Sequence, residues 1–117
     1  MISENLQNIV SKLPDNITLV AVSKFHPAEA VLEAYNAGQR IFGESRVQEI
    51  TSKAPLLPED TEWHFIGHLQ TNKVAQLLRI GNLKLIHSID SNRLLQVVDK
   101  EAVKAGRTVD VLLEIHV

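Results

Sequence analysis

Short apolar, β-branched runs alternate with amphipathic stretches along almost the whole chain of 117 residues. The runs predict strands, because they are brief, rich in Val and Ile, and bounded by turn residues. The predicted strands cover residues 17–23, 40–43, 62–66, 84–89 and 109–117. Strands that alternate with helices are joined as parallel neighbours by right-handed crossovers. The chain is therefore predicted to be an α/β protein with one extra helix before its first strand.

Five glycines separate these segments and fall into two sets. Gly38, Gly81 and Gly106 each close an amphipathic stretch, where a left-handed backbone after a helix favours glycine. Gly43 and Gly67 instead follow the apolar runs RIFG and WHFIG, where a strand passes into a loop. Glycine at such a joint permits a sharp turn or a close approach by a ligand.

Helix signals fill the gaps between the apolar runs. Pro27 is predicted to open a helix at its first position, where a missing N–H is harmless. A second helix is expected over residues 44–54. Thr71 or a residue near it is expected to cap the third helix, and Asp90 or Ser91 the fourth.

Two closures fit such a series: an open doubly wound sheet and a (β/α)8 TIM barrel. No GxGxxG follows the first strand and no P-loop lysine pattern occurs, so the nucleotide-binding marks of the open sheet are missing. This favours the barrel. A complete barrel takes about 250 residues. We therefore expect residues 1–117 to be an incomplete barrel domain, the N-terminal part, whose open edges another chain would cap or share by self-association.

Composition narrows the class of protein. Hydrophobic residues make up 44% and charged residues 22%, as in soluble globular proteins. The net charge of −2 argues against nucleic acid or an anionic membrane as the main partner, since both attract basic surfaces. Cysteine is absent, which excludes disulfides and thiolate sites. Neither a signal peptide nor an apolar stretch of about 20 residues is found, so we expect a cytoplasmic protein.

Lys24 is the leading candidate for chemistry because it ends the first apolar run, LVAVSK. Ligand sites of α/β barrels form at the carboxyl ends of strands. Apolar surroundings lower the pKa of a lysine and make its neutral amine available as a nucleophile. From position alone, a solvated lysine at the start of a loop is the commoner outcome.

Glycines and small polar residues at the neighbouring strand ends strengthen this candidate. Ser45, Gly67 and Ser88 follow or end the next three apolar runs, so they are predicted to stand beside Lys24 around a barrel mouth. Backbone and hydroxyl donors there would surround a ligand. Ordinary turn chemistry explains the same residues, and both interpretations stay open at this point.

Histidines are the second group of candidate functional residues. His64 and His68 are four residues apart, a spacing that places two metal ligands on one face of a helix. The residues between them predict strand and turn, so their rings are not expected to share a face, and no metal site is predicted. His64 is expected to be a strand position, and His116 to pack in the core or an interface.

Several motifs occur in one order: LVAVSK, EAYNAGQR, FGE with VQE close behind, WHFIGHLQTNK and IHSID. In this order and spacing, over residues 19–117, the chain resembles the YggS/PROSC family of pyridoxal phosphate homeostasis proteins. The resemblance implies a barrel like the N-terminal domain of alanine racemases, with pyridoxal 5′-phosphate (PLP) at its mouth.

The resemblance also assigns roles to residues. It implies that Lys24 holds PLP as a Schiff base and that Ser45, Gly67 and Ser88 line the pocket. Where the family usually has Asn, this chain has Ser45, and a hydroxyl offers one donor against the two of an amide. The phosphate-binding loops of the family lie beyond residue 117, so the 117-residue chain is expected to bind PLP weakly or to be found without it.

The implied function is intracellular vitamin B6 homeostasis: a protein that holds PLP and passes it on, to PLP-dependent apoenzymes, without turnover of its own. Two alternatives stay open. A PLP-dependent amino-acid racemase needs a second base on the other face of the cofactor. A cofactor-free α/β interaction module would leave Lys24 as an ordinary surface residue.

Overall fold

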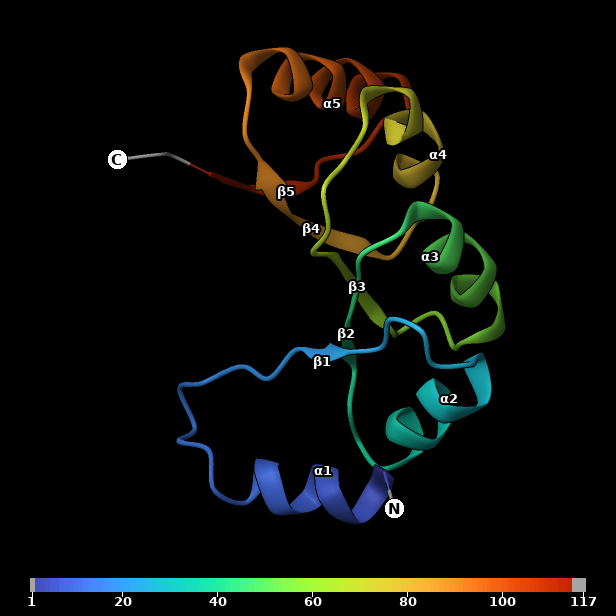
Figure 1. Cartoon of the computed structure of the whole chain (residues 1–117), viewed down its shortest axis with the longest axis vertical. Coiled ribbons are helices and arrows are strands. Elements are labelled where there is room, and N and C mark those ends of the chain that lie inside the picture. Colours follow the sequence, from blue (N-terminus) through green and yellow to red (C-terminus); the bar gives the residue numbers. More distant parts are fainter. Residues whose placement is uncertain (1, 115–117) are drawn as a thin grey trace.

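The computed structural model describes residues 2–114 and shows a single sheet of five parallel strands (Figure 1). The strands are β1 (Ala21–Val22), β2 (Ile41–Glu44), β3 (Glu62–Phe65), β4 (Leu83–Ile89) and β5 (Asp110–Leu113). Each strand lies beside its neighbour in sequence, and all four pairs are parallel. This is the strand order of a barrel wall, whereas a doubly wound sheet reverses its order at a switch point. The predicted α/β class is confirmed.

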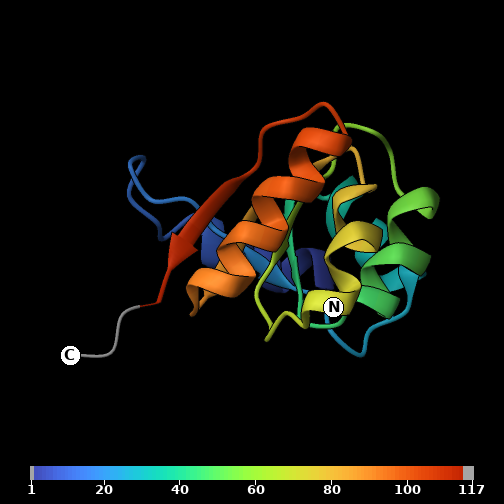
Figure 2. The same cartoon turned by 90° about the horizontal axis from the view of Figure 1, so that it is seen from above.

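Helices precede and connect the strands. They are α1 (Ile2–Val10), α2 (Ala28–Asn36), α3 (Val47–Lys53), α4 (Val74–Leu78) and α5 (Asn92–Lys104), with the 3₁₀ turns η1 (Ala54–Leu56) and η2 (Thr71–Lys73). Helices α2 to α5 lie side by side against one face of the sheet (Figures 1 and 2). We call this face the covered face and its opposite the open face. None of the helices within residues 2–114 is both long and apolar enough to cross a membrane.

The core lies between the sheet and these helices. On the central strands Phe42, Trp63, Phe65 and Ile86 are at most 1% exposed. The rings of Phe42 and Trp63, on neighbouring strands, lie 5.9 Å apart. The apolar positions of the helices, spaced at one face, meet these side chains.

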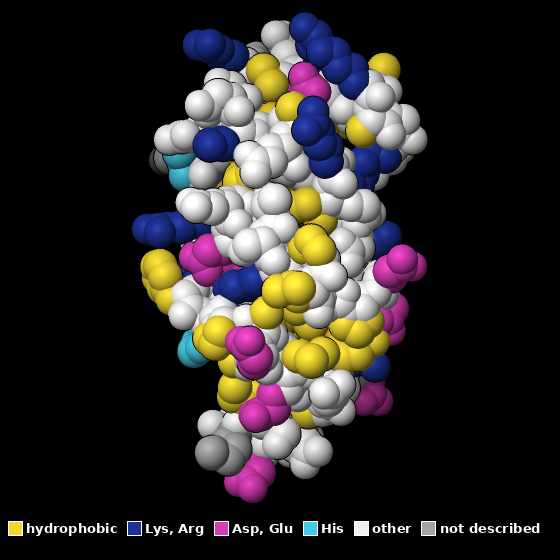
Figure 3. Space-filling model, turned by 90° about the vertical axis from the view of Figure 1, so that its right-hand side faces the viewer, with side chains coloured by type: hydrophobic (Ala, Val, Ile, Leu, Met, Phe, Trp, Pro, Cys, Tyr) yellow, Lys and Arg dark blue, Asp and Glu magenta, His cyan; other side chains and the backbone are white. Residues whose placement is uncertain are grey.

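Seen from the helix side, the basic side chains gather mostly toward the α5 end of the molecule (Figure 3).

The open face carries the alternate residues of the strands. Val22 and Leu112 lie there, because their neighbours Ala21 and Val111 pair with the covered-face residues of β2 and β4. Val22 is 51% exposed and Leu112 is 49% exposed. Helices thus cover the sheet on one face only (Figures 1 and 2).

The first strand is shorter than predicted. Only Ala21 and Val22 of the expected strand 17–23 are in β1, and Ile17 is 52% exposed. The sequence pattern predicted a strand covered on both faces, and this expectation is wrong because the helices cover only one. The fifth strand ends at Leu113, and Glu114 follows it with its N–H donating to the Ile89 carbonyl at 2.8 Å. Residues 115–117 of the predicted range, His116 among them, lie outside the described residues.

The helix boundaries differ from the predictions in detail. Glu44 ends β2, so the helix expected over residues 44–54 begins only at Val47 and continues into η1. Pro27 is the N-cap of α2, so the helix begins at Ala28, one residue later than predicted. Ser91 is the N-cap of α5, as predicted, and its Oγ accepts a hydrogen bond from the Leu94 N–H at 3.1 Å. Thr71 begins η2, whose N-cap is Gln70, and the N-cap of α4 is the nearby Lys73.

The glycine assignments are confirmed in part. Gly38 and Gly106 follow α2 and α5 with φ of 112° and 65°, in the left-handed region predicted for them. Gly81 does not have a positive φ, because α4 already ends at Leu78 and a turn separates the two.

Candidate functional site

Lys24 and Ser45 occupy equivalent places at one edge of the sheet. Val22 pairs with Gly43 in the parallel ladder of β1 and β2. Lys24 and Ser45 each lie two residues beyond this pair, so both follow the carboxyl ends of their strands. The predicted juxtaposition at the carboxyl edge is therefore seen in the backbone.

Gly67 and Ser88 belong to the same edge. Phe65 pairs with Ile86 in the ladder of β3 and β4, and Gly67 and Ser88 each lie two residues further along. Ser88 is still within β4, whereas Gly67 follows the end of β3. The four predicted site residues thus stand at the carboxyl ends of four consecutive strands.

Gly67 is in close contact with the backbone of Ser45. A Cβ atom built on Gly67 would lie 2.2 Å from the carbonyl oxygen of Ser45. The Ile66 N–H, one residue earlier, donates to the carbonyl of Glu44 at 2.8 Å. Glycine was expected here for a sharp turn or for a ligand, and the close neighbour is instead the protein's own main chain.

Lys24 lies in a tight turn that spans residues 23–26. The His26 N–H donates to the Ser23 carbonyl at 3.1 Å, and Phe25, third in the turn, has φ of 65°. A positive φ at that place is typical of a type II turn, which normally has glycine or asparagine there. Lys24 is exposed and Phe25 is 70% exposed. The apolar surroundings predicted for the Lys24 side chain are therefore not seen.

A buried polar cluster lies beneath this turn and was missed by the sequence analysis. Ser23 Oγ donates to Glu44 Oε2 at 2.5 Å. Lys53 Nζ donates to Glu44 Oε2 at 2.8 Å and to the Ser23 carbonyl at 2.8 Å. Lys53 Nζ also donates to Glu49 Oε2 at 3.0 Å, and the Phe25 N–H donates to the same oxygen at 2.9 Å. We call Ser23, Glu44, Glu49 and Lys53 the turn cluster.

Burial makes the turn cluster energetically important. Glu44 is 0% exposed, Ser23 4% and Lys53 6%. An ammonium has three donors, and Lys53 finds three acceptors. Glu44 Oε1 is buried without a hydrogen-bond partner among the described residues. The pKa of Glu49 is lowered, first by the Phe25 N–H and then by the Lys53 ammonium. The cluster thus holds its charges largely out of water.

A second chain of polar groups crosses the open face. His64 Nε2 lies 3.3 Å from Glu62 Oε2, and His64 Nδ1 lies 3.3 Å from His87 Nε2. Burial and the neighbouring His64 lower the pKa of His87. His64 is in β3, as predicted, and His68 is exposed in the loop beyond. No group of three metal-ligating side chains is found within residues 2–114.

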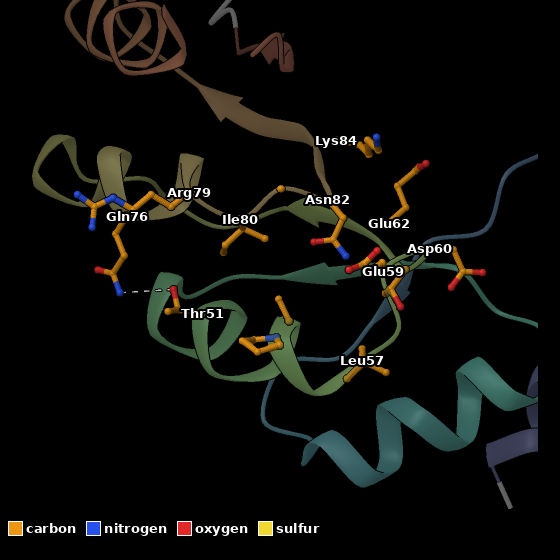
Figure 4. A pocket seen from close by; sticks show the side chains of 14 residues that line it. Thr51, Leu57, Glu59, Asp60, Glu62, Gln76, Arg79, Ile80, Asn82 and Lys84 are labelled. Carbon is orange, nitrogen blue, oxygen red and sulfur yellow. Dashed lines mark hydrogen bonds between the residues drawn. The ribbon is translucent and has the colours of Figure 1, made fainter. Parts of the chain in front are cut away.

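A hollow opens at the other edge of the sheet. A cavity of about 1100 Å³ lies between η1 and the start of β4, at the amino ends of β3 and β4 (Figure 4). Glu59, Asp60, Glu62 and Lys84 line it toward one end, and Gln76 and Arg79 line it toward the other. None of the four predicted site residues lines it. The cavity is therefore separate from the candidate cofactor site.

Comparison with known proteins identifies the family. The model of the family described as "Alanine racemase, N-terminal domain" matches residues 1–117. The chain belongs to this family. Its relatives include proteins named "Pyridoxal phosphate homeostasis protein": that of Schizosaccharomyces pombe is 50% identical over 84 residues, and that of Aquifex aeolicus is 46% identical over 100 residues. These matches cover 72% and 85% of this chain, but only 35% and 43% of the relatives.

Solved structures agree with the sequence relatives. PipY of Synechococcus elongatus, a structure described as having PLP bound, superposes with a TM-score of 0.92 at 42% identity. The match covers 100% of this chain and 55% of PipY. Alanine racemase of Enterococcus faecalis superposes with a TM-score of 0.71 at 18% identity over 86% of the chain and 27% of the racemase, and it shows the shared fold alone. The chain is thus a partial barrel, and the resemblance drawn from its motifs is confirmed.

Proposed function

We propose that this chain is the N-terminal part of a PLP-binding protein of intracellular vitamin B6 homeostasis, and that Lys24 holds the cofactor as a Schiff base. The observation that carries the proposal is the position of Lys24, an exposed primary amine at the carboxyl edge of a partial barrel. The names of the relatives, and the PLP bound to PipY, support the class of ligand.

The residues of the carboxyl edge fit a ligand with a reactive carbonyl. PLP supplies an aldehyde that condenses with primary amines. Lys24 Nζ would attack the aldehyde carbon, forming a carbon–nitrogen double bond while the oxygen leaves as water. Ser45 and Ser88 offer hydroxyl donors at the neighbouring strand ends, and we propose that they and the Gly67 backbone line the pocket.

Exposure of Lys24 suits a carrier. The carbon–nitrogen bond is broken by water, and an exposed amine leaves water and an acceptor protein free to reach it. We propose PLP-dependent apoenzymes as the recipients. A racemase would need a second base near Lys24, but Tyr35, the chain's one tyrosine, lies at the end of α2 that leads to the amino edge, and its hydroxyl donates to Asp60.

The test is reductive trapping of PLP. The protein is incubated with PLP, reduced with borohydride and digested, and the modified lysine is identified by mass spectrometry. Lys24→Ala should abolish both the labelling and the absorbance of the bound form, whereas Lys104→Ala, which removes an exposed lysine of α5, should change neither. Equal labelling of wild type and Lys24→Ala would refute the proposal.

The same experiment compares the chain with the complete encoded protein. We expect weaker PLP binding by the 117-residue chain, which spans 55% of the length of PipY. Amino-acid racemisation above background by the complete protein would favour the enzyme. Absence of any PLP absorbance in the complete protein would favour the cofactor-free module.

A further inference from the structure

We infer that Glu49, Lys53 and Glu44 are positioning residues that hold the turn around Lys24 and thereby fix where its amine is presented. The inference rests on the proposed role of Lys24 and deepens it, because it names residues that act on the cofactor through Lys24. Its basis is the pair of hydrogen bonds from α3 to the backbone of residues 23 and 25, together with the bond that joins Lys53 of α3 to Glu44 of β2.

The turn needs an external support because Phe25 has an unfavourable backbone. At φ of 65° a residue with a Cβ is in the left-handed region, which glycine enters freely and other residues do not. The ring of Phe25 does not supply the support by burial, since the residue is 70% exposed. Among residues 2–114, the Arg46 guanidinium lies over this ring, 5.4 Å from its centroid.

Helix α3 is hydrogen-bonded to the turn on both sides of Lys24. Glu49 accepts the Phe25 N–H at 2.9 Å, one residue after Lys24. Lys53 donates to the Ser23 carbonyl at 2.8 Å, one residue before Lys24. Glu49 and Lys53 are four apart on α3 and are joined to each other at 3.0 Å. One face of one helical turn therefore holds both peptide groups that flank the lysine.

Strand β2 in turn fixes Lys53. Glu44, at the end of β2, receives the Lys53 ammonium at 2.8 Å and the Ser23 hydroxyl at 2.5 Å on the same oxygen. A buried ion pair of this kind has little freedom, because moving either charge leaves the other without a partner in a dry site. The position of the Lys24 turn is thus coupled to the strand beside it.

The first test uses the protein without any cofactor. Exchange of the Phe25 amide hydrogen is measured by NMR in wild type and in Glu49→Ala. Loss of the charge-assisted bond should speed exchange by about tenfold or more. The control is Glu101→Ala, which removes a carboxylate paired with Lys104 on the surface of α5 and should leave the Phe25 amide unchanged. An unchanged Phe25 amide in Glu49→Ala would overturn the inference.

The second test separates positioning from general stability by a rescue. Phe25→Gly and Phe25→Ala both remove the ring, but only glycine adopts the left-handed backbone freely. In the complete protein, Glu49→Ala should lower borohydride-trapped labelling of Lys24 by PLP. Adding Phe25→Gly should restore that labelling, and adding Phe25→Ala should not. Equal labelling in the two double variants would show that Glu49 does not act through the turn.

Conservative variants keep the test decisive if alanine prevents folding. Glu49→Gln retains an oxygen that can accept the Phe25 N–H, so it should preserve slow exchange, with thermal unfolding used to confirm that each variant is folded. The two proposals fail in different ways. If Lys24 is not the PLP lysine, Lys24→Ala will not change labelling, while the exchange result for Phe25 stands.

Discussion

The two faces of the sheet each carry a chain of polar groups, and the two chains differ in setting. On the covered face the turn cluster joins Glu44 to Lys53 at 2.8 Å, with both residues at most 6% exposed. On the open face His64 bridges Glu62 and His87 through contacts of 3.3 Å, and the Glu62 side chain is 37% exposed. The Glu44–Lys53 contact is the shorter one and joins two buried charges, whereas the contacts of His64 are longer and their chain reaches solvent at Glu62.

The difference indicates which polar groups stabilise the fold. Buried charges interact strongly, but only while each has its partner, whereas solvent weakens an exposed pair and also replaces it when it breaks. We therefore expect changes to the turn cluster to alter folding and the candidate site together. Changes to the histidine chain should alter mainly the response to pH.

The largest effect is expected for Lys53→Met. The change leaves the Glu44 carboxylate buried without its cation, and breaking such a pair destabilises a protein by about 3–5 kcal/mol. Adding Glu44→Leu should recover most of the loss, since an apolar pair removes both charges. Chemical denaturation of the single and double variants measures this, and a double variant as unstable as Lys53→Met would contradict the account.

Matched leucines on the two faces test the burial difference next. Leu83 of β4 is 0% exposed, and Leu83→Ala should lower the free energy of unfolding by about 2–5 kcal/mol. Leu112 of β5 is 49% exposed on the open face, and Leu112→Ala should change it by no more than about 0.5 kcal/mol. Similar losses in urea denaturation of the 117-residue chain would mean that the open face is covered in solution.

A smaller loss is expected at the carboxyl edge, where the two faces meet. Gly67→Ala places a methyl group against the Ser45 carbonyl, and overpacking against backbone destabilises by about 1–3 kcal/mol. Gly81→Ala is the control, because a Cβ there meets nothing within 4 Å and the backbone is not left-handed. The account fails if the two variants have the same melting temperature.

Acid should loosen the turn cluster through Glu49. Its pKa is lowered in the folded protein, so its contribution to stability is present above its usual value of 4.5 and is lost as the pH falls through the lower, folded value. The groups that face it are the Phe25 N–H, Lys53 and Arg46. Glu49→Gln should flatten this acid limb in a pH series of unfolding free energies, by less than the loss in Gly67→Ala.

The smallest effect should come from His87 on the open face. Because its pKa is lowered, the unfolded chain binds more protons, and stability should decline as the pH falls through the usual histidine value of 6.5. His64, and through it Glu62, are the titratable groups that face it. His87→Gln should remove this slope and His68→Gln, in the exposed loop, should not. Equal slopes in both variants would rule out His87 as the source.

The sequence predicted the path of the chain better than the contacts of its site. Apolar runs and glycines located the five strands, because burial and backbone freedom leave local patterns. The length of β1 and the exposure of Val22 could not be predicted from the sequence, since they depend on what covers each face of the sheet. Lys24 was placed correctly at a strand end, but its surroundings were predicted as apolar and are exposed.

The turn cluster was hidden for a related reason. Glu49 and Lys53 show the spacing of an ordinary surface pair on a helix, and Glu44 was assigned to that same helix rather than to β2. Only the register of β1 and β2 brings Ser23 beside Glu44 and turns the pair inward. The available signal was a charged residue directly after a short apolar run. Local periodicity does not show whether such a residue is buried.

Phe25 is a position at which the native residue is not the one that folding alone would choose. Glycine would enter the left-handed backbone freely and would remove an exposed ring. Saturation mutagenesis selected for folded protein should therefore enrich glycine at this position. A parallel selection for PLP capture would reveal whether the ring is favoured once the ligand is present. At the turn around Lys24, these two selections would separate the residue preferred for folding from the residue preferred for function.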